Sequence, residues 1–136
     1  EFMFELFSTP RYCQWNIHVH YAQYTGEWNV EGKSYDRSNV KAYNTYGTGR
    51  VNGYKIMEET LNLRDVRIFD YIEDGNGMKT ALLNKKETAI AQGKQELIKQ
   101  AFADWIWSDP ERREQLTKLY NEKFNSIRPA SMTAAT

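Results

Sequence analysis

The fold class of this chain follows from residues 66–84, which read VRIFDYIEDGNGMKTALLN. The first part of this stretch is rich in branched and aromatic residues, the Gly-Asn-Gly at positions 75–77 is typical of a tight turn, and the last part is again apolar. Two such runs around a short glycine-containing turn predict a β-hairpin. Asn84 stands three residues before Glu87, and an Asn side chain can accept a hydrogen bond from a free backbone N–H at the start of a helix. We therefore expect a hairpin that leads directly into a helix.

Two amphipathic helices are predicted after the hairpin. The first has apolar residues at helical spacing, and its stripe consists of Ile90, Leu97, Ile98, Ala101, Phe102, Trp105 and Ile106. Pro110 suits the first turn of the second helix, with Ser108 or Asp109 as its N-cap. Because the second helix would turn back across the end of the first, we expect Trp105 and Ile106 to lie in the core.

Shorter elements precede the hairpin. Residues 2–7 form an apolar run that stops before Pro10, as at the end of a helix. In residues 15–22 the apolar positions Trp15, Ile17, Val19 and Tyr21 alternate with other residues. This alternation predicts a strand with one buried face. A second short strand is expected within residues 27–35, with a turn at Glu31-Gly32.

Two further segments complete the pattern. Residues 38–53 are rich in Asn, Gly, Ser and Tyr without a period, so we expect an ordered loop. Residues 51–63 return to helical spacing, with one stripe formed by Val51, Tyr54, Met57 or Glu58, and Leu61. Together these elements predict a single α+β domain over residues 1–129, with N-terminal short strands and a loop, a central β-hairpin and two C-terminal amphipathic helices.

Length and composition indicate an ordinary globular domain. The chain has 136 residues, of which 40% are hydrophobic and 26% charged, and its formal net charge is zero. Such a chain carries no strong overall field to attract nucleic acid, so any such binding has to be local. No apolar run approaches the roughly 20 residues that span a bilayer, and the single cysteine, Cys13, cannot form an intrachain disulfide. We expect a cytoplasmic protein without membrane partners.

Motifs that would indicate catalysis or metal binding are weak. The stretch GEWNVEGKS is similar to a phosphate-binding P-loop, but five residues separate Gly26 from Gly32 where that loop has four. A plain turn is the simpler interpretation. His18 and His20 share one face of a strand without a third metal ligand nearby, and Cys13 has no partner that would activate it as a nucleophile. We therefore expect no enzyme activity, metal or cofactor.

A local basic segment is the candidate for nucleic-acid contact. Between Lys33 and Lys55 five cations face one carboxylate, Asp36, and four tyrosines lie among them. Cations can contact phosphates and aromatic rings can stack on bases, but tyrosines in such a loop also pack on their own domain. Both interpretations stay open. The candidate DNA-binding residues are Lys33, Arg37, Lys41, Tyr43, Tyr46, Arg50 and Lys55, while the remaining tyrosines are Tyr35 and Tyr54.

Residues 24–129 resemble a segment of the large fusion proteins of a helicase and an adenine-specific DNA methyltransferase that bacterial plasmids, phages and integrative elements carry. The similarity lies in YTGEWNV (24–30), KSYDRSNVKAYNTYGTGRVNGYKI (33–56), ETLNLRDVRIFDYIED (59–74) and LNKKETAIAQGKQELIKQAFADWIWSDPERREQLTKLYNEKFNSIRP (83–129). In those proteins this stretch joins the methylase half to the Swi/Snf-type helicase half. The methylase signature, the helicase P-loop and the helicase acidic box are absent from this chain, so the resemblance implies a context and no active site.

The final residues, ASMTAAT at positions 130–136, depart from this pattern. The resemblance implies Arg-Glu-Tyr-Asp-Gly-Ser-His after Pro129. Suitable codons for that heptapeptide, read after the loss of one base, encode Ala-Ser-Met-Thr-Ala-Ala-Thr, the sequence found here. We therefore expect a shifted reading frame after Pro129, a disordered tail, and a chain that is a fragment of a larger protein.

The resemblance implies a non-catalytic module that connects the methylase and helicase parts or guides DNA between them. Two alternatives stay open: a protein-protein docking module without DNA contact, and a target-recognition part of the methylase. The expected partners are the neighbouring methylase and helicase domains. DNA binding is expected to be weak, because at most five basic groups can reach phosphate.

Overall fold

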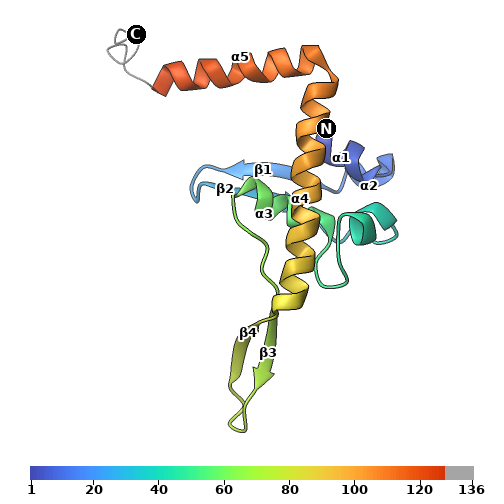
Figure 1. Ribbon diagram of the computed structural model, residues 1–136, viewed down its shortest axis with the longest axis vertical. Helices are drawn as coiled ribbons and strands as arrows, with labels where there is room; N and C mark the ends of the chain where they lie inside the picture. The colour runs from blue at the N-terminus through green and yellow to red at the C-terminus, as the bar shows by residue number, and fades with distance from the viewer. Residues whose placement is uncertain (128–136) are drawn as a thin grey trace. The chain divides into compact units, whose positions relative to one another are not determined.

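The computed structural model describes residues 1–127 and confirms the α+β class, with helices and two small antiparallel sheets (Figure 1). The elements are α1 (Phe2–Phe7), α2 (Arg11–Gln14), β1 (His18–Ala22), β2 (Glu27–Glu31), the π-helical turn η1 (Lys41–Thr45), α3 (Gly53–Leu61), β3 (Phe69–Glu73), β4 (Lys79–Leu83), α4 (Lys85–Ser108) and α5 (Pro110–Ile127). They fall into two compact units, Glu1–Ala101 and a second unit that begins at Phe102. The expected tail at positions 130–136 lies outside the described residues.

The core of the first unit forms around α1 and α3. The ring of Phe7 is fully buried and meets the ring of Tyr54 edge-on, with centroids 4.9 Å apart. Gly53 lies directly beneath the Phe7 ring, and a Cβ at this position would come within 2.8 Å of it. A glycine is therefore required where α3 begins. Ile56 on α3 and Ile98 on α4 extend the same core.

The first hairpin pairs β1 with β2, and Val19 lies opposite Val30. Val30 is fully buried, whereas Val19 and Tyr21 on β1 are exposed. The predicted buried face of residues 15–22 is therefore wrong, because Ile17, just before β1, is the buried position of that face. The physical reason is that α3 packs against β2, so β1 lies at the uncovered edge of a two-stranded sheet.

The expected loop at residues 38–53 is partly helical. Tyr46 N donates to the carbonyl of Lys41 five positions earlier, at 2.8 Å, which is the hydrogen bond of a π-helical turn. The Asn39 side chain accepts hydrogen bonds from the N–H groups of Lys41 (3.0 Å) and Ala42 (3.3 Å) at its start. Ala42 is fully buried. Packing of this turn on the core orders a segment whose composition alone indicates a loop.

The predicted helix at residues 51–63 is confirmed as α3. Its N-cap is Asn52, whose side chain accepts a hydrogen bond from Lys55 N at 3.0 Å. Tyr54, Met57 and Glu58 are buried, as the predicted stripe requires. Ile56 is also fully buried, so the buried surface of this helix is wider than that stripe.

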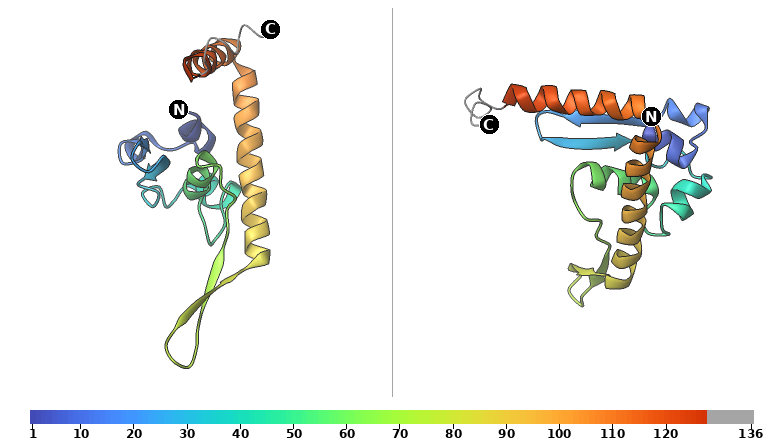
Figure 2. Two further views of the ribbon diagram at one scale, coloured as in Figure 1. Left: turned by 90° about the vertical axis from the view of Figure 1, so that its left-hand side faces the viewer. Right: turned by 45° about the horizontal axis from the view of Figure 1, so that its top comes forward.

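The second hairpin confirms the strongest sequence signal. β3 and β4 pair antiparallel, with Phe69 opposite Leu83 and Glu73 opposite Lys79. Asn84 caps α4, since its side chain accepts a hydrogen bond from Glu87 N at 3.0 Å. No residue of either strand is fully buried, and Figure 2 shows the hairpin extending beyond the other elements of its unit.

The two C-terminal helices are confirmed, but of the predicted stripe of α4 only Ile98 is buried. Ile90 and Leu97 are exposed, whereas Thr88 and Gln95 are buried, because these polar side chains bind a neighbouring backbone segment described below. In the second unit, Trp105 and Ile106 are half-buried and do not form a core.

Contacts close to the junction of α4 and α5 explain the position of Trp105. Its ring stacks on Phe102, with centroids 6.0 Å apart, and the guanidinium of Arg112 lies 3.7 Å from the ring centroid. Asp109 caps α5 as expected, since its carboxylate accepts hydrogen bonds from the backbone N–H groups of Glu111 (3.0 Å) and Arg112 (3.3 Å).

Candidate functional site

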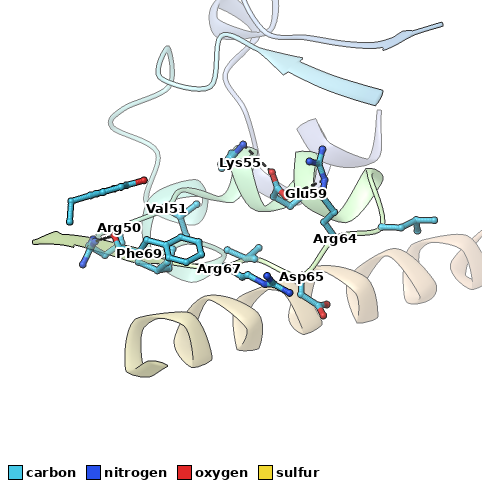
Figure 3. A pocket seen from close by; sticks show the side chains of 12 residues that line it. Arg50, Val51, Lys55, Glu59, Arg64, Asp65, Arg67 and Phe69 are labelled. Carbon is cyan, nitrogen blue, oxygen red and sulfur yellow. Dashed lines mark hydrogen bonds and ion pairs between the residues drawn. The ribbon is translucent and has the colours of Figure 1, made fainter. Parts of the chain in front are cut away.

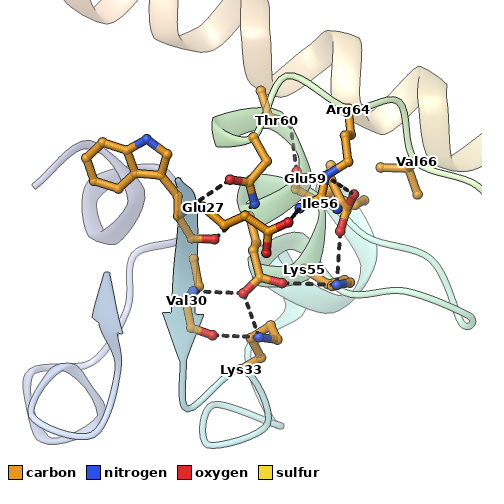
Figure 4. A network of polar contacts seen from close by, with 12 residues as sticks. Glu27, Val30, Lys33, Lys55, Ile56, Glu59, Thr60, Arg64 and Val66 are labelled. Carbon is orange, nitrogen blue, oxygen red and sulfur yellow. Dashed lines mark hydrogen bonds and ion pairs between the residues drawn. The ribbon is translucent and has the colours of Figure 1, made fainter. Parts of the chain in front are cut away.

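The outer edge of β2 is closed by the carboxylate of Glu58 on α3 (Figure 4). Glu58 Oε2 accepts hydrogen bonds from the backbone N–H of Val30 and from Lys33 Nζ, both at 2.8 Å, and Oε1 accepts one from Lys55 Nζ at 3.0 Å. Burial alone would raise the pKa of Glu58, but the hydrogen bonds from Lys33, Val30 and Lys55 lower it to about 2. Glu58 is therefore ionised and fully engaged in holding the first hairpin.

Asn62 closes the same edge one turn further along the chain. Its side chain accepts a hydrogen bond from the Trp28 N–H at 2.7 Å and donates one to the Trp28 carbonyl at 2.9 Å. Lys33 Nζ also donates to the Val30 carbonyl at 2.7 Å. The N–H and C=O groups of Trp28 and Val30 that point away from β1 therefore all have partners.

Three of the five predicted DNA-binding cations form ion pairs within the domain. Lys33 and Lys55 both bind Glu58, and Lys55 also pairs with Glu59 at 3.0 Å. Arg50 forms an ion pair with Asp70 on β3 at 2.9 Å. The hydrogen bonds from Arg50 and then from Asn84 lower the pKa of Asp70.

Arg37 and Lys41 are the two predicted cations without a carboxylate partner among the described residues. The Nε of Arg37 donates to the carbonyl of Ser34 at 3.2 Å, and Lys41 Nζ donates to the hydroxyl of Ser8 at 2.9 Å. Both residues are exposed. They are the part of the predicted basic set that remains available to an anion.

The tyrosines of this segment mostly pack on their own domain. Tyr43 and Tyr46 are half-buried and contact the core, while Tyr35 is exposed. Tyr54 is fully buried, its hydroxyl donates to Asp36 Oδ2 at 2.9 Å, and it lies 2.7 Å from the hydroxyl of Thr9. Burial raises the pKa of Tyr54.

The structure places the P-loop-like stretch, Cys13 and the two histidines in ordinary structural positions. The P-loop-like stretch is β2 followed by a turn at Gly32. Burial and the neighbouring Asp36 raise the pKa of the Cys13 thiol, and His20 Nε2 lies 3.1 Å from a carboxylate oxygen of Glu31. Within residues 1–127, no group of three or more His, Cys, Asp or Glu side chains could hold a metal ion.

A ladder of α4 side chains holds the extended segment that leads from α3 into β3. Thr88 Oγ1 accepts a hydrogen bond from Ile68 N (2.9 Å), Gln92 donates to the Val66 carbonyl (3.1 Å), and Gln95 Oε1 accepts one from Val66 N (3.2 Å). Gln95 also donates to the carbonyl of Arg64 at 2.8 Å. These three side chains take the place of a neighbouring strand.

This ladder uses one edge of the segment and leaves the other edge open. Val66 and Ile68 are buried and bond to α4, whereas Asp65 and Arg67, which alternate with them along the chain, are exposed. Backbone groups of alternate residues in an extended chain point in opposite directions. Among the described residues, the backbone N–H and C=O groups of Asp65 and Arg67 have no protein partner.

The open segment lines a groove of about 790 Å³ that also runs along α3 (Figure 3). Its apolar lining includes Val51, Val66, Ile68 and Phe69, and its charged lining consists of the cations Arg50, Lys55, Arg64 and Arg67 with the carboxylates of Glu59 and Asp65. The Arg64 guanidinium forms ion pairs with Glu27 at 3.5 Å and with Glu59 at 3.6 Å. Arg67 has no ion pair within residues 1–127.

Leu63 at the rim of this groove has an unusual backbone conformation. Its φ is +58°, and its side chain is 94% exposed. Arg64 N donates to the carbonyl of Glu59 at 2.9 Å, so Leu63 occupies the left-handed position after α3 where glycine is the usual residue. A leucine here costs conformational energy and gains no burial in its own chain.

Sequence reasoning missed the groove and found the cations on only one side of it. Arg50 and Lys55 are in the predicted set, whereas Arg64 lies between the predicted helix (51–63) and the predicted hairpin (66–84), and Arg67 lies within that hairpin. The sequence does contain a signal, because the run LRDVRIF alternates charged and branched residues before β3. That alternation indicates an extended segment with one exposed side.

Comparison with known proteins gives a family and no activity. The chain belongs to a family described as a domain of unknown function, DUF8437, whose family model matches residues 1–126. No curated protein and no solved structure matches the chain. None of the helices in residues 1–127 has the length and apolar character needed to cross a membrane.

Proposed function

We propose that this DUF8437 domain is a non-catalytic connecting module that docks onto neighbouring protein segments through the β3–β4 hairpin. The observation that carries the proposal is the exposure of large apolar side chains on both faces of that hairpin. Tyr71, Ile72 and Leu82 are 70%, 53% and 56% exposed. Exposed large apolar side chains that gather on a face mark interaction sites, and Ile72 and Leu82 share one face of this hairpin.

The register of β3 and β4 places the exposed apolar side chains on both faces of the hairpin. Tyr71 lies opposite Ala81, and Ile72 lies opposite Thr80, so Tyr71 and Ile72 point to opposite faces of the hairpin. A two-stranded hairpin is only marginally stable in water without a covering layer. A partner that covers either face would therefore both bind and order it.

The resemblance of residues 24–129 to the junction of helicase and adenine methyltransferase fusion proteins supports the choice of partner. A segment between two large halves needs a surface that contacts at least one of them. We therefore propose the methylase-type and helicase-type segments of such a fusion protein as the docking partners, in a bacterial cytoplasm.

DNA guiding is the second candidate function, and Arg37 and Lys41 support it. These cations are exposed and have no carboxylate partner in the described part of the chain. Two free cations predict weak binding whose affinity falls as the salt concentration rises. The dissociation constant should lie at the weak end of the non-specific range, near about 10⁻⁴ M.

The proposal is tested by titrating the chain against separately produced methylase-type and helicase-type segments in a calorimeter. We expect binding by at least one of them, and a loss of at least about tenfold in the double variant Ile72→Ser, Leu82→Ser. The matched control is Ile90→Ser, an exposed apolar residue on α4. An absence of binding to both segments, or equal losses in the control, contradicts the docking role.

A parallel titration with a fluorescent DNA duplex at low salt tests the second candidate. The comparison is between the native chain and the double variant Arg37→Ala, Lys41→Ala. Arg50 is left unchanged, because its ion pair with Asp70 has a structural role. Binding to DNA that this variant abolishes, together with no binding to the protein segments, would replace docking by DNA guiding.

A further inference from the structure

We propose that the groove beside α3 binds an extended peptide with acidic side chains, which adds as a strand along the open edge of residues 65–67. This inference rests on the proposed docking role, for which it names the chemistry of one partner segment.

The backbone of Asp65 and Arg67 supplies the hydrogen-bonding groups. Each of these residues presents an N–H and a C=O without a protein partner in the described structure, at the two-residue spacing of a strand edge. Peptides that add to an open edge gain their affinity from such main-chain hydrogen bonds. Because α4 side chains hold Arg64, Val66 and Ile68 from the other side, the edge is already in the extended conformation that an added strand requires.

The groove also has an end. Arg50 Nη2 donates to the Phe69 carbonyl at 3.0 Å, so the next outward carbonyl of the segment is already occupied. A bound strand therefore pairs with residues 65–67 and ends, or bends away, at Arg50. The expected ligand is a short stretch of extended chain.

The charges of the groove favour acidic side chains in that ligand. Of the four cations that line it, Arg50, Lys55 and Arg64 are already in ion pairs, whereas Arg67 is exposed without an ion pair in the described structure. An added strand places alternate side chains on the same face. One row would lie on the face of Arg64 and Val66, and the other on the face of Arg67 and Phe69, so each row meets one cation and one apolar side chain of the groove.

Leu63 gives independent support for a ligand. A left-handed leucine with an exposed side chain has no benefit inside this chain, and strained residues of this kind cluster at binding sites. At the rim of the groove its side chain would cover an apolar residue of the bound peptide.

The test uses a capped hexapeptide of alternating Val and Glu, titrated into the full chain labelled with ¹⁵N. We expect the amide signals of Asp65 and Arg67 to shift on binding. The same peptide with Lys in place of Glu should bind at least about tenfold more weakly. A fully N-methylated Val-Glu peptide should not bind, because its backbone donors are gone.

Two variants of Arg67 separate the contribution of its backbone N–H to peptide binding from the contribution of its charge. Arg67→Pro removes an outward N–H that has no internal partner and should abolish binding, since proline is tolerated on such an edge. Arg67→Ala removes only the charge and should retain part of the affinity. Leu63→Gly should weaken binding while the thermal midpoint rises. If circular dichroism shows that Arg67→Pro is unfolded, Leu63→Gly and the N-methylated peptide carry the test.

Equal binding by the N-methylated peptide, or by Arg67→Pro in folded form, overturns strand addition. Self-association of the chain alone that Arg67→Pro abolishes would assign the edge to a second copy and also overturn the proposal. The variant Ile72→Ser, Leu82→Ser should bind the hexapeptide normally. Binding of the fusion-protein segments without binding of the peptide contradicts this inference alone, and the reverse result contradicts the proposed function.

Discussion

The two β-hairpins of this domain have strands of the same length, but α3 covers the first hairpin and the second is exposed. Each pairs two five-residue strands antiparallel. In the first, Glu58 and Asn62 close the outer edge of β2 and Val30 is fully buried, whereas no residue of β3 or β4 is fully buried. The difference shows that a helix that covers a strand edge makes a hairpin part of the core, and that an uncovered hairpin remains available for a partner.

The largest expected effect is on the edge that α3 covers. Glu58→Ala leaves the Val30 N–H and two lysines without their shared acceptor, so we expect a loss of about 4 kcal/mol in the free energy of unfolding. Urea denaturation measures it. Glu59→Ala is the matched control, because Glu59 is more exposed and, among the described residues, pairs with Lys55 and Arg64 alone. Its cost should be about 1 kcal/mol or less. Similar costs for the two variants would show that the first hairpin does not depend on its capped edge.

The same carboxylate should make the stability of the domain depend on pH. The pKa of Glu58 is lowered from its ordinary value of 4.5 to about 2 in the folded chain. Its contribution is therefore fully present above pH 4.5 and is lost as the pH falls towards 2, by about 3 kcal/mol. Urea denaturation at a series of pH values measures this slope, and Glu58→Gln should flatten it. An unchanged slope in that variant would assign the acid sensitivity to other groups.

Truncation of apolar residues should affect the two hairpins unequally. Val30→Ala opens a cavity in the core and should cost about 2 kcal/mol. Ile72→Ser on the second hairpin replaces an exposed side chain and should change the stability by about 0.5 kcal/mol or less. Thermal denaturation of both variants measures the difference. A large cost for Ile72→Ser would mean that the second hairpin is covered in solution by its own chain or by another copy.

The last expected effect has the opposite sign. Leu63→Gly relieves a left-handed backbone without loss of a buried contact and should stabilise the domain by about 1 kcal/mol. Ser8 has a φ of +49° at the end of α1, and Ser8→Gly is the control for a left-handed position away from the groove, although it also removes the exposed hydrogen bond from Lys41 Nζ. Destabilisation by Leu63→Gly, with Ser8→Gly stabilising as expected, would show that the Leu63 side chain has a structural role.

Local features of the fold were predictable from the sequence. The Gly-Asn-Gly turn and the caps Asn84 and Asp109 each depend on residues within a few positions of one another, so the sequence contains the whole signal. The buried face of α4 was not predictable in the same way. Thr88 and Gln95 are polar and would be assigned to solvent by periodicity, but they are buried because the backbone of residues 64–68 needs partners.

The candidate site was predictable only in part for the same reason. Lys33 and Lys55 look free along the sequence, since their contact with Glu58 needs β2 to pack on α3. The spacing of Lys55 to Glu58 and Glu59 was a readable signal for the ion pairs within α3. The open edge at Asp65 and Arg67 had no such signal, because it depends on which side of the segment α4 occupies.

The α4 ladder also determines the order in which the domain can form. The partner of Ile68 lies 20 positions later in the chain, and that of Val66 lies 29 positions later. A chain synthesised from its N-terminus therefore exposes residues 64–68 before the side chains that bind them exist. Both edges of the segment are open during that interval, and open strand edges pair with other chains. The middle of this unit therefore stays open to wrong pairing until α4 has been synthesised.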